Sequence, residues 1–335
     1  MPRLRRVRPT DPGWTRRRQG RGWSYLDETG ARITDAEAVA RCTGLVIPPA
    51  WREVWICLHP EGHIQAMGTD DAGRRQYLYH PQWRARRDRA KHDHVVEMAR
   101  HLPRARRRVE ADLRLPGLGR VRVLALAFRL LDDAYFRAGG ESYTRDNGSF
   151  GLATLRREHV KIADDGAWFA YPAKSGQWRE AQVTDPAVVD VVRELLARDD
   201  PGRELLAWQD EDCGWHDVTA TDVLEDVKAR LGPEARPKDF RTWHATVLAA
   251  AGLAEVDARS ERARRRAVAQ VVREVAEELG NTPAVARGSY IDPRLIDLWE
   301  RGQTIGHRRT RASAERAVIE LLGAGADPSP AASAT

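Results

Sequence analysis

The sequence contains few cysteines and no long apolar run. Its three cysteines, Cys42, Cys57 and Cys213, lie far apart and form no CxxC pair, which argues against both a disulfide framework and a structural zinc site. No apolar segment approaches the ~18 residues that a membrane span requires, and no hydrophobic segment follows the arginine-rich N-terminus, so we expect neither a transmembrane helix nor a secretory signal. These absences predict a soluble, cytoplasmic protein.

Two patterns that bind common cofactors are also absent. The sequence has no GxxxxGK[ST] segment, which argues against ATP use, and it has no cluster of carboxylates that would hold a divalent metal. The pattern nearest to a metal site is His92-Asp93-His94, and we interpret it as an exposed helix surface. We therefore expect no cofactor, neither a metal ion nor a nucleotide.

Positive charge is what the sequence has in excess. Lysine plus arginine number 55 against 49 for aspartate plus glutamate, which gives a net charge of +6. Eight arginines fall between Arg3 and Arg21 against a single acid, Asp11, and a second basic run follows Trp83. Because a concentrated basic surface attracts polyanions, nucleic acid is the first partner to consider.

The chain is long enough for two domains, with 335 residues of which 42% are apolar. Between Trp14 and Tyr79, short apolar or aromatic runs alternate with glycine turns, which predicts an antiparallel sheet interrupted by one helix near residues 35–42. After His80 the apolar residues recur every three and four positions, which predicts helices. We therefore predict an α+β fold with a small β-rich domain over residues 1–90, flexible at 1–12, a mainly α-helical domain over 91–322, and a disordered tail over 323–335.

One segment interrupts the helical pattern. The runs EHVKIA, AWFAYPA and WREAQV alternate β-branched and aromatic residues and are separated by the turns DDG and KSGQ. This arrangement predicts a three-stranded antiparallel meander inside the helical domain, with Lys174 at its second tight turn. A lysine at the tip of a hairpin can reach into a neighbouring groove.

The stretch GNTPAVARGSYID contains a lone tyrosine, Tyr290, near many arginines. Gly280 is placed to end the preceding apolar helix in a left-handed conformation, and Thr282 is placed to cap a new helix that has Pro283 at its first position. Asn281 and Tyr290 would then bracket a short helix that fixes the distance between them. Tyr290 is either a core residue, with Asn281 serving the turn, or a nucleophile.

Basic residues in three other segments favour the nucleophile. Arg137 follows an apolar helix and precedes a Gly-Gly pair, which would aim its guanidinium into open space. Arg241 lies at a helix start beside Lys238 and Asp239, and Lys174 lies on the predicted hairpin. Each of these residues alone would be interpreted as a surface or salt-bridge residue. Their combination with a tyrosine is typical of a more definite site.

These segments resemble the bacterial, poxvirus-like type IB DNA topoisomerases. The matching segments, in the order of that family, are GRRQYLYH, AYFRAGG, GLATLRREHVKI, YPAKSG, KDFRTW and LGNTPAVARGSY, and they span nearly the whole chain. The resemblance implies catalytic roles for Arg137, Lys174, Arg241 and Tyr290. Poxvirus members carry histidine where this chain has Asn281, which implies that Asn281 donates a hydrogen bond to a nonbridging phosphate oxygen without protonation chemistry.

The resemblance also implies the reaction. Tyr290 would attack a DNA phosphodiester and form a 3′-phosphotyrosyl intermediate with a free 5′-hydroxyl, and religation would follow relaxation of the supercoil. Arginines and Asn281 would stabilise the nonbridging oxygens, Lys174 would protonate the leaving oxygen, and no metal or ATP would be needed. The β-rich domain and the helical catalytic domain would close around duplex DNA as a monomeric, nucleoid-associated clamp.

The segment GRRQYLYH has two interpretations. Its tyrosines either form one face of an edge strand or, as the resemblance implies, contact bases and phosphates in the major groove. Arg74 and Arg75 would then hold phosphates. The residues for which we predict DNA contact are Arg74, Arg75, Gln76, Tyr77, Tyr79 and Lys238.

Two other functions remain open at this point. A tyrosine recombinase shares the nucleophile and the arginine pair, but that family usually has HxxRH where this chain has Lys238-Asp-Phe-Arg241-Thr. A non-enzymatic protein that coats DNA would account for the arginines but not for their placement with Lys174 and Tyr290. Relaxation of supercoils without recombination would distinguish the three.

Overall fold

The computed structural model describes residues 3–140, Thr144 and residues 148–324. The chain divides into an N-terminal unit, Met1–Lys91, and a C-terminal unit, His92–Thr335, and the division falls inside the long helix α2 (Pro81–Leu113). None of the helices in the described part of the chain is both long enough and apolar enough to cross a membrane. The predicted disordered tail lies outside the described residues from residue 325 onward, and its first two residues belong to helix α11 (Arg311–Ala324).

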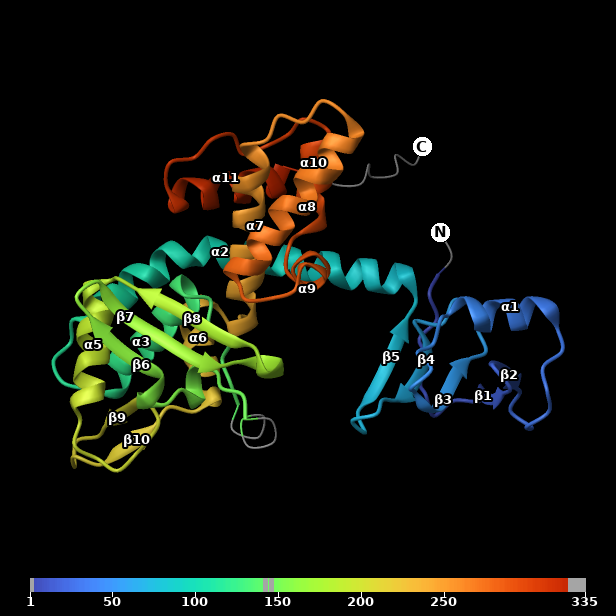
Figure 1. Ribbon diagram of the computed structural model, residues 1–335, viewed down its shortest axis with the longest axis horizontal. Coiled ribbons are helices and arrows are strands. Elements are labelled where there is room, and N and C mark those ends of the chain that lie inside the picture. The colour runs from blue at the N-terminus through green and yellow to red at the C-terminus, as the bar shows by residue number, and fades with distance from the viewer. Residues whose placement is uncertain (1–2, 141–143, 145–147, 325–335) are drawn as a thin grey trace, which may run out of the picture. The chain divides into compact units, whose positions relative to one another are not determined.

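The N-terminal unit contains the predicted antiparallel sheet, which is confirmed (Figure 1). Its strand order is β2-β1-β3-β4-β5, and the strands are β1 (Gly13–Gln19), β2 (Gly22–Leu26), β3 (Arg52–Cys57), β4 (Ile64–Thr69) and β5 (Arg75–Tyr79). The predicted helix is α1 (Ala36–Gly44), and it begins where the Asp35 carboxylate accepts a hydrogen bond from the Ala38 backbone N–H. A capping aspartate satisfies one of the unpaired N–H groups of a first helical turn.

Within residues 3–12, the chain is packed against this sheet at Arg5 and Val7, contrary to the flexibility predicted for this segment. Arg5 pairs with Gly62 in a parallel bridge, and its backbone bonds to both Glu61 and His63. Val7 is 6% exposed and packs in a small apolar cluster with Trp55. The arginines around Val7 obscured this anchor in the sequence, because a single apolar residue among charges carries no periodic signal.

The C-terminal unit is mainly helical and contains the predicted three-stranded meander, which is confirmed (Figure 1). Its strands are β6 (Val160–Ala163), β7 (Gly166–Pro172) and β8 (Trp178–Val183), in that order. A short hairpin that the sequence did not reveal, β9 (Ala207–Gln209) with β10 (Trp215–Asp217), lies beyond it in the chain. Besides α2 and α11, the helices are α3 (Arg120–Asp133), α5 (Pro186–Ala197), α6 (Ala220–Leu231), α7 (Pro237–Ala254), α8 (Glu261–Glu278), α9 (Pro283–Ser289) and α10 (Pro293–Glu300).

Helices α3 and α7 form the centre of this unit. Ten of the fourteen residues of α3 and twelve of the eighteen residues of α7 are buried. A helix that is apolar on most of its faces must be surrounded by other elements, and α7 accordingly contacts α3, α6, α8, α10 and α11. Polar side chains that project from these two helices are therefore held in a rigid environment.

Candidate active site

All five residues predicted to be catalytic line one pocket of about 550 Å³ in the C-terminal unit. They come from four separate segments of the chain, and Lys238 lines the same pocket. The five residues are Arg137, Lys174, Arg241, Asn281 and Tyr290. The structure thus brings together side chains that are far apart in the sequence.

Arg137 is anchored on the wall of this pocket. Its Nη2 donates a 2.7 Å hydrogen bond to Oδ1 of Asn281 and a 3.2 Å bond to the carbonyl of Gly280. The guanidinium thus lines an open pocket, as expected, and is in addition anchored at the corner between α8 and α9. A guanidinium fixed by two acceptors keeps its remaining N–H groups in one orientation.

Gly139, two residues after Arg137, allows its backbone to lie against the backbone of Gly151. Gly139 has φ +78°, and a Cβ placed on it would lie 2.9 Å from the backbone of Gly151. Next to this contact, Leu152 and Ala153 donate their backbone N–H groups to the carbonyls of residues 137 and 138 at 2.8 Å. The Arg137 segment is thus held at backbone level before any ligand binds.

Arg241 lies in the first turns of α7 and is 2% exposed. Its Nη1 donates to the carbonyl of Tyr135, and its Nη2 donates to the carbonyl of Leu279 at 2.5 Å. Its guanidinium carbon lies 5.4 Å from the ring centroid of Tyr290. Burial, together with the nearby Arg137 charge, lowers the pKa of Arg241 to about 10, so the group stays cationic near neutral pH.

The corner that carries Asn281 and Tyr290 has the predicted local structure, which is confirmed. Gly280 has φ +58° after the end of α8, Thr282 accepts a hydrogen bond from Val285 N, and Pro283 opens α9. Glycine adopts this left-handed conformation without steric cost. Tyr290 is the residue that ends α9, so the two functional positions flank a single short helix.

Only the oxygen of the Asn281 amide forms a hydrogen bond among the described residues. Oδ1 accepts from Arg137, whereas Nδ2 is buried and has no hydrogen-bond partner among the described residues. An unpaired buried N–H is costly in a folded protein. Asn281 also lines the pocket, so its amide lies beside the other four residues.

Thr246 on α7, which sequence reasoning missed, fixes the backbone around Tyr290. Its hydroxyl donates to the Tyr290 carbonyl at 3.3 Å and accepts from Asp292 N at 3.2 Å. Lys174 is positioned differently, in an exposed 3₁₀ turn (Lys174–Gly176) between β7 and β8. The pocket therefore combines side chains held by the packed helices with one exposed amine at a hairpin tip.

Comparisons with known proteins agree with this arrangement. A family model described as "Eukaryotic DNA topoisomerase I, catalytic core" matches residues 80–301, and one described as "Bacterial DNA topoisomerase IB, N-terminal domain" matches residues 22–70. The chain belongs to the type IB DNA topoisomerase family. This assignment decides between the three functions that the sequence left open.

Viral members of this family are among the relatives. The chain is 28% identical over 284 residues to DNA topoisomerase 1B of Acanthamoeba polyphaga mimivirus, covering 82% of this chain and 84% of that protein. It is 25% identical over 243 residues to DNA topoisomerase 1B of Vaccinia virus (strain Copenhagen), covering 69% of this chain and 71% of that protein. The topoisomerase likeness thus extends through most of the chain.

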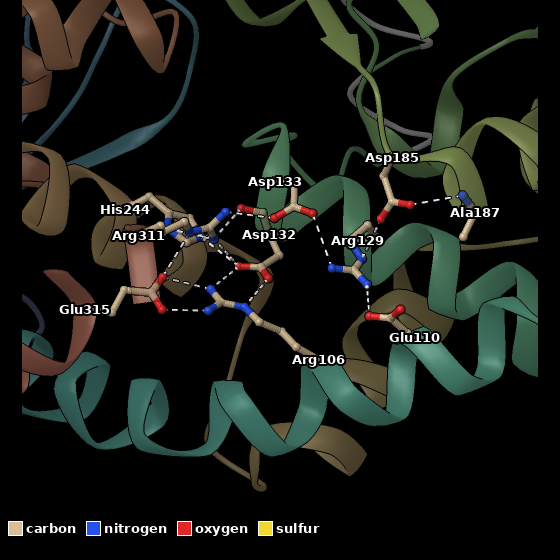
Figure 2. Close-up of polar contacts among 10 residues, drawn as sticks. All are labelled: Arg106, Glu110, Arg129, Asp132, Asp133, Asp185, Ala187, His244, Arg311 and Glu315. Carbon is tan, nitrogen blue, oxygen red and sulfur yellow. Dashed lines mark hydrogen bonds and ion pairs between the residues drawn. The ribbon is translucent and has the colours of Figure 1, made fainter. Parts of the chain in front are cut away.

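A group of charged side chains from four helices lies around the end of α3 (Figure 2). Asp132, at the end of α3, is fully buried and accepts from Arg106 at 2.6 and 2.9 Å, from Arg311 at 2.7 Å, and shares a 3.0 Å hydrogen bond with His244. Glu315 of α11 bonds to both arginines. This charged cluster (Arg106, Asp132, Asp133, His244, Arg311 and Glu315) joins α2, α3, α7 and α11.

Residues of the charged cluster shift one another's pKa values. Burial acts to raise the pKa of Asp132, but the hydrogen bonds from His244 and Arg106 lower that pKa well below the usual range. Burial also lowers the pKa of His244, whose ring lies 5.1 Å from the ring of Tyr135. The cluster therefore reaches Tyr135, whose carbonyl holds Arg241.

The interpretation of His92-Asp93-His94 as an exposed helix surface is wrong for His92 and holds for Asp93, which is exposed. His92 is 5% exposed, Asp93 accepts from Arg294 at 2.6 Å, and His94 lies 3.1 Å from Asp239. These residues tie α2 to α7 and α10. In the described ranges, no three His, Cys, Asp or Glu side chains are grouped so that they could hold a metal ion.

The predicted DNA-contact tyrosines lie on β5 at the end of the sheet in the N-terminal unit. Tyr77 and Tyr79 are 38% and 45% exposed, and their rings stack with centroids 6.1 Å apart. Arg75 is on the same face of the strand, because residues two apart in a strand point to the same side. DNA contact at this face stays a prediction.

Arg74 and Gln76 are engaged with a neighbouring acid. Arg74 Nε and Gln76 Nε2 donate to Oδ2 of Asp70 at 3.0 and 2.9 Å. The amide oxygen of Gln76 is not used in this contact. A base edge would therefore meet Gln76 with its amide already oriented by Asp70.

Proposed function

We propose that this topoisomerase relaxes supercoiled duplex DNA by transient cleavage of one strand, as a monomer and without a metal ion or ATP. The observation that supports this proposal best is the convergence of a tyrosine, two arginines, a lysine and an asparagine on one pocket. Such a set matches the needs of a phosphate whose charge increases as it is attacked.

In the proposed first step, the Tyr290 hydroxyl oxygen attacks the scissile phosphorus. The bond from phosphorus to the 5′-oxygen breaks, and the phosphate becomes linked to Tyr290 on its 3′ side. The phosphoester conserves the bond energy, so the reverse attack by the 5′-hydroxyl reseals the strand without an energy source. Between the two steps, the free end can rotate and the supercoil relaxes.

We infer that three donors stabilise the nonbridging oxygens during this step. Arg137 and Arg241 are cationic, and their orientation is fixed by backbone and amide acceptors. Asn281 Nδ2 supplies a neutral donor that is buried and unpaired among the described residues. Donors that are already oriented stabilise a transition state without reorganisation at the moment of reaction.

The leaving 5′-oxygen requires a proton, because an alkoxide is too basic to leave unaided. Lys174 is the donor that we infer. It lies at an exposed hairpin tip and lines the same pocket as Tyr290. An amine on a flexible stem can reach an oxygen on the opposite side of the phosphorus from the attacking tyrosine.

We infer that duplex DNA is held by both units. In the N-terminal unit, Arg74 and Arg75 would contact phosphates, while Gln76, Tyr77 and Tyr79 would meet the major groove. In the C-terminal unit, Lys238 at the pocket edge would hold a further phosphate. The two units would close as a clamp, and an enzyme with this substrate would associate with the nucleoid in the cytoplasm.

Incubation with supercoiled plasmid in EDTA without ATP tests the proposal. We expect relaxation of both positive and negative supercoils, and we expect Tyr290→Phe to abolish relaxation and covalent adduct formation while duplex binding remains. Tyr25→Phe serves as a matched control, since Tyr25 is a core residue of the N-terminal unit. Strict dependence on magnesium or ATP, or a trapped adduct mapped to another tyrosine, would refute the mechanism.

A further inference from the structure

Arg179, which no motif singles out, joins two segments of the active site. It lies at the start of β8, shortly after Lys174 in the chain. Its Nη2 donates to the carbonyl of Ala134 at 3.0 Å, and its Nη1 donates to the carbonyl of Glu278 at 3.3 Å. Ala134 is the residue that follows α3, and Glu278 is the last residue of α8.

Arg241 makes the same kind of bridge one residue further along both segments. It holds the carbonyls of Tyr135 and Leu279, each the next residue after an acceptor of Arg179. Two guanidinium groups from different elements, β8 and α7, therefore bind consecutive carbonyls of the same two segments. The double bridge sets the spacing between the end of α3 and the end of α8.

The end of α8 is suited to such a bridge. The last carbonyls of a helix have no partner within the helix, and the helix dipole favours a cation there. Arg179 also lies against Gly280, since a Cβ placed on that glycine would be 2.7 Å from Arg179 Nη1. The guanidinium thus contacts the backbone that leads directly into Asn281.

The end of α3 benefits from a bridge for another reason. Tyr135 has φ +56°, a left-handed conformation that costs a bulky residue free energy and persists only when its surroundings impose it. Arg179 holds the residue before Tyr135, and Arg241 holds Tyr135 itself. Arg137 follows two residues later, so its direction depends on this bend.

Arg179 does not line the pocket that contains Tyr290. It lines a separate groove of about 600 Å³ with Ala134, Tyr135 and several acidic residues. On β7, Tyr171 is the cross-strand neighbour of Arg179. The side chain of Arg179 therefore has hydrogen-bond partners in two segments of the site and lies outside the pocket that contains Tyr290.

We propose that Arg179 is a positioning residue of this active site, which fixes Arg137 and Asn281 relative to each other. This inference rests on the proposed function. It assigns to Arg179 no contact with DNA and no proton transfer. Its effect is on the geometry of the groups that contact the phosphate.

Single-turnover cleavage of a suicide duplex by Arg179→Met tests the proposal. Methionine keeps the apolar stem but removes both bridging hydrogen bonds, and misplacing catalytic groups by about 1 Å costs on the order of 10²-fold in rate. We expect a loss of about that size with duplex affinity unchanged. Arg193→Met on α5 is the matched control, because Arg193 is exposed and paired only with Asp190, and it should cleave like the parent.

Two further measurements separate positioning from a structural or chemical role. Asn281→Ala combined with Arg179→Met should lose less than the product of the two single losses, because both changes act on one geometry. A 5′-bridging sulfur should not restore cleavage by Arg179→Met, since no acid is missing. Additive losses, rescue by sulfur, or cleavage at the parent rate would each overturn the inference.

Arg179→Lys keeps the inference testable if Arg179→Met fails to fold. Its single ammonium retains the charge but cannot span two carbonyls in a fixed fork, so a slower rate is expected in a folded protein. A folded Arg179→Lys that cleaves at the parent rate would refute the proposal. Failure of the parent protein to relax plasmid would instead refute the proposed function.

Discussion

Asn281 gives the sharpest test of how the pocket treats a phosphate. Its Oδ1 accepts from Arg137 at 2.7 Å, while Nδ2 is buried without a partner among the described residues. Asn281→Ala removes both functions. Loss of one oriented donor to a transition-state oxyanion costs about 10²–10³ in rate, and Arg137 also loses its amide anchor, so we expect Asn281→Ala to cleave about 10³-fold more slowly than the parent.

Two other substitutions separate the acceptor function of Asn281 from its donor function. Asn281→Asp keeps the shape and the acceptor for Arg137 but replaces the donor with a second oxygen, so it should be at least as slow as Asn281→Ala. Asn281→His should retain most activity, because a neutral imidazole offers one acceptor and one donor, as the amide does. The expected order of rates is therefore parent, histidine, then alanine and aspartate.

The assay is single-turnover cleavage on a suicide duplex, with duplex binding measured separately so that weak association is not mistaken for slow chemistry. The phosphotyrosyl product is counted directly. If Asn281→Ala cleaves as fast as the parent, the buried Nδ2 does not act on the phosphate. Asn281 would then be only the turn residue ahead of the Thr282 cap.

Three further predictions concern the lysine and the charged cluster. Lys174→Ala should cleave slowly on normal DNA but recover on a duplex with a 5′-bridging sulfur, because a thiolate leaves without an acid; an unrescued variant would contradict the acid role. Burial lowers the pKa of His244 in the folded protein, so below pH ~6.5 the unfolded chain binds a proton at His244 that the folded chain does not. The free energy of unfolding should therefore fall by up to about 1.4 kcal/mol for each unit by which the pH decreases. Urea titrations at pH 7.5 and 5.5 should show this slope in the parent and not in His244→Gln. Arg106→Met leaves the fully buried Asp132 with fewer partners and should cost about 3–5 kcal/mol of stability by urea denaturation; a loss below about 1 kcal/mol would contradict a buried ion network.

Much of the pocket could be predicted because its parts carry local signals. A glycine, an N-capping threonine and a proline in order specify the corner around Asn281, since each residue acts on its own backbone. The hairpin with Lys174 likewise follows from alternating residues around a tight turn. The spatial meeting of these segments was supplied by the resemblance to a family and not by any local pattern.

The supporting residues could not be predicted in the same way. Arg179 and Arg311 look like surface arginines in the sequence, because their partners are main-chain carbonyls or acids that lie far away in the chain. His92 was misread for the same reason. Burial of a charged or polar group is decided by tertiary contacts, which a periodic pattern does not record.

The charged cluster has a consequence for the order in which this protein is made. Asp132 emerges from the ribosome long before Arg311 and Glu315, and Tyr290 emerges after Asp132 but before Arg311. A nascent chain that ends between Tyr290 and Arg311 contains the proposed nucleophile but still lacks α11, whose Arg311 pairs with Asp132 at the end of α3. A chain truncated before residue 311 would therefore contain Tyr290 without the ion pairs that α11 makes with Asp132 and Arg106.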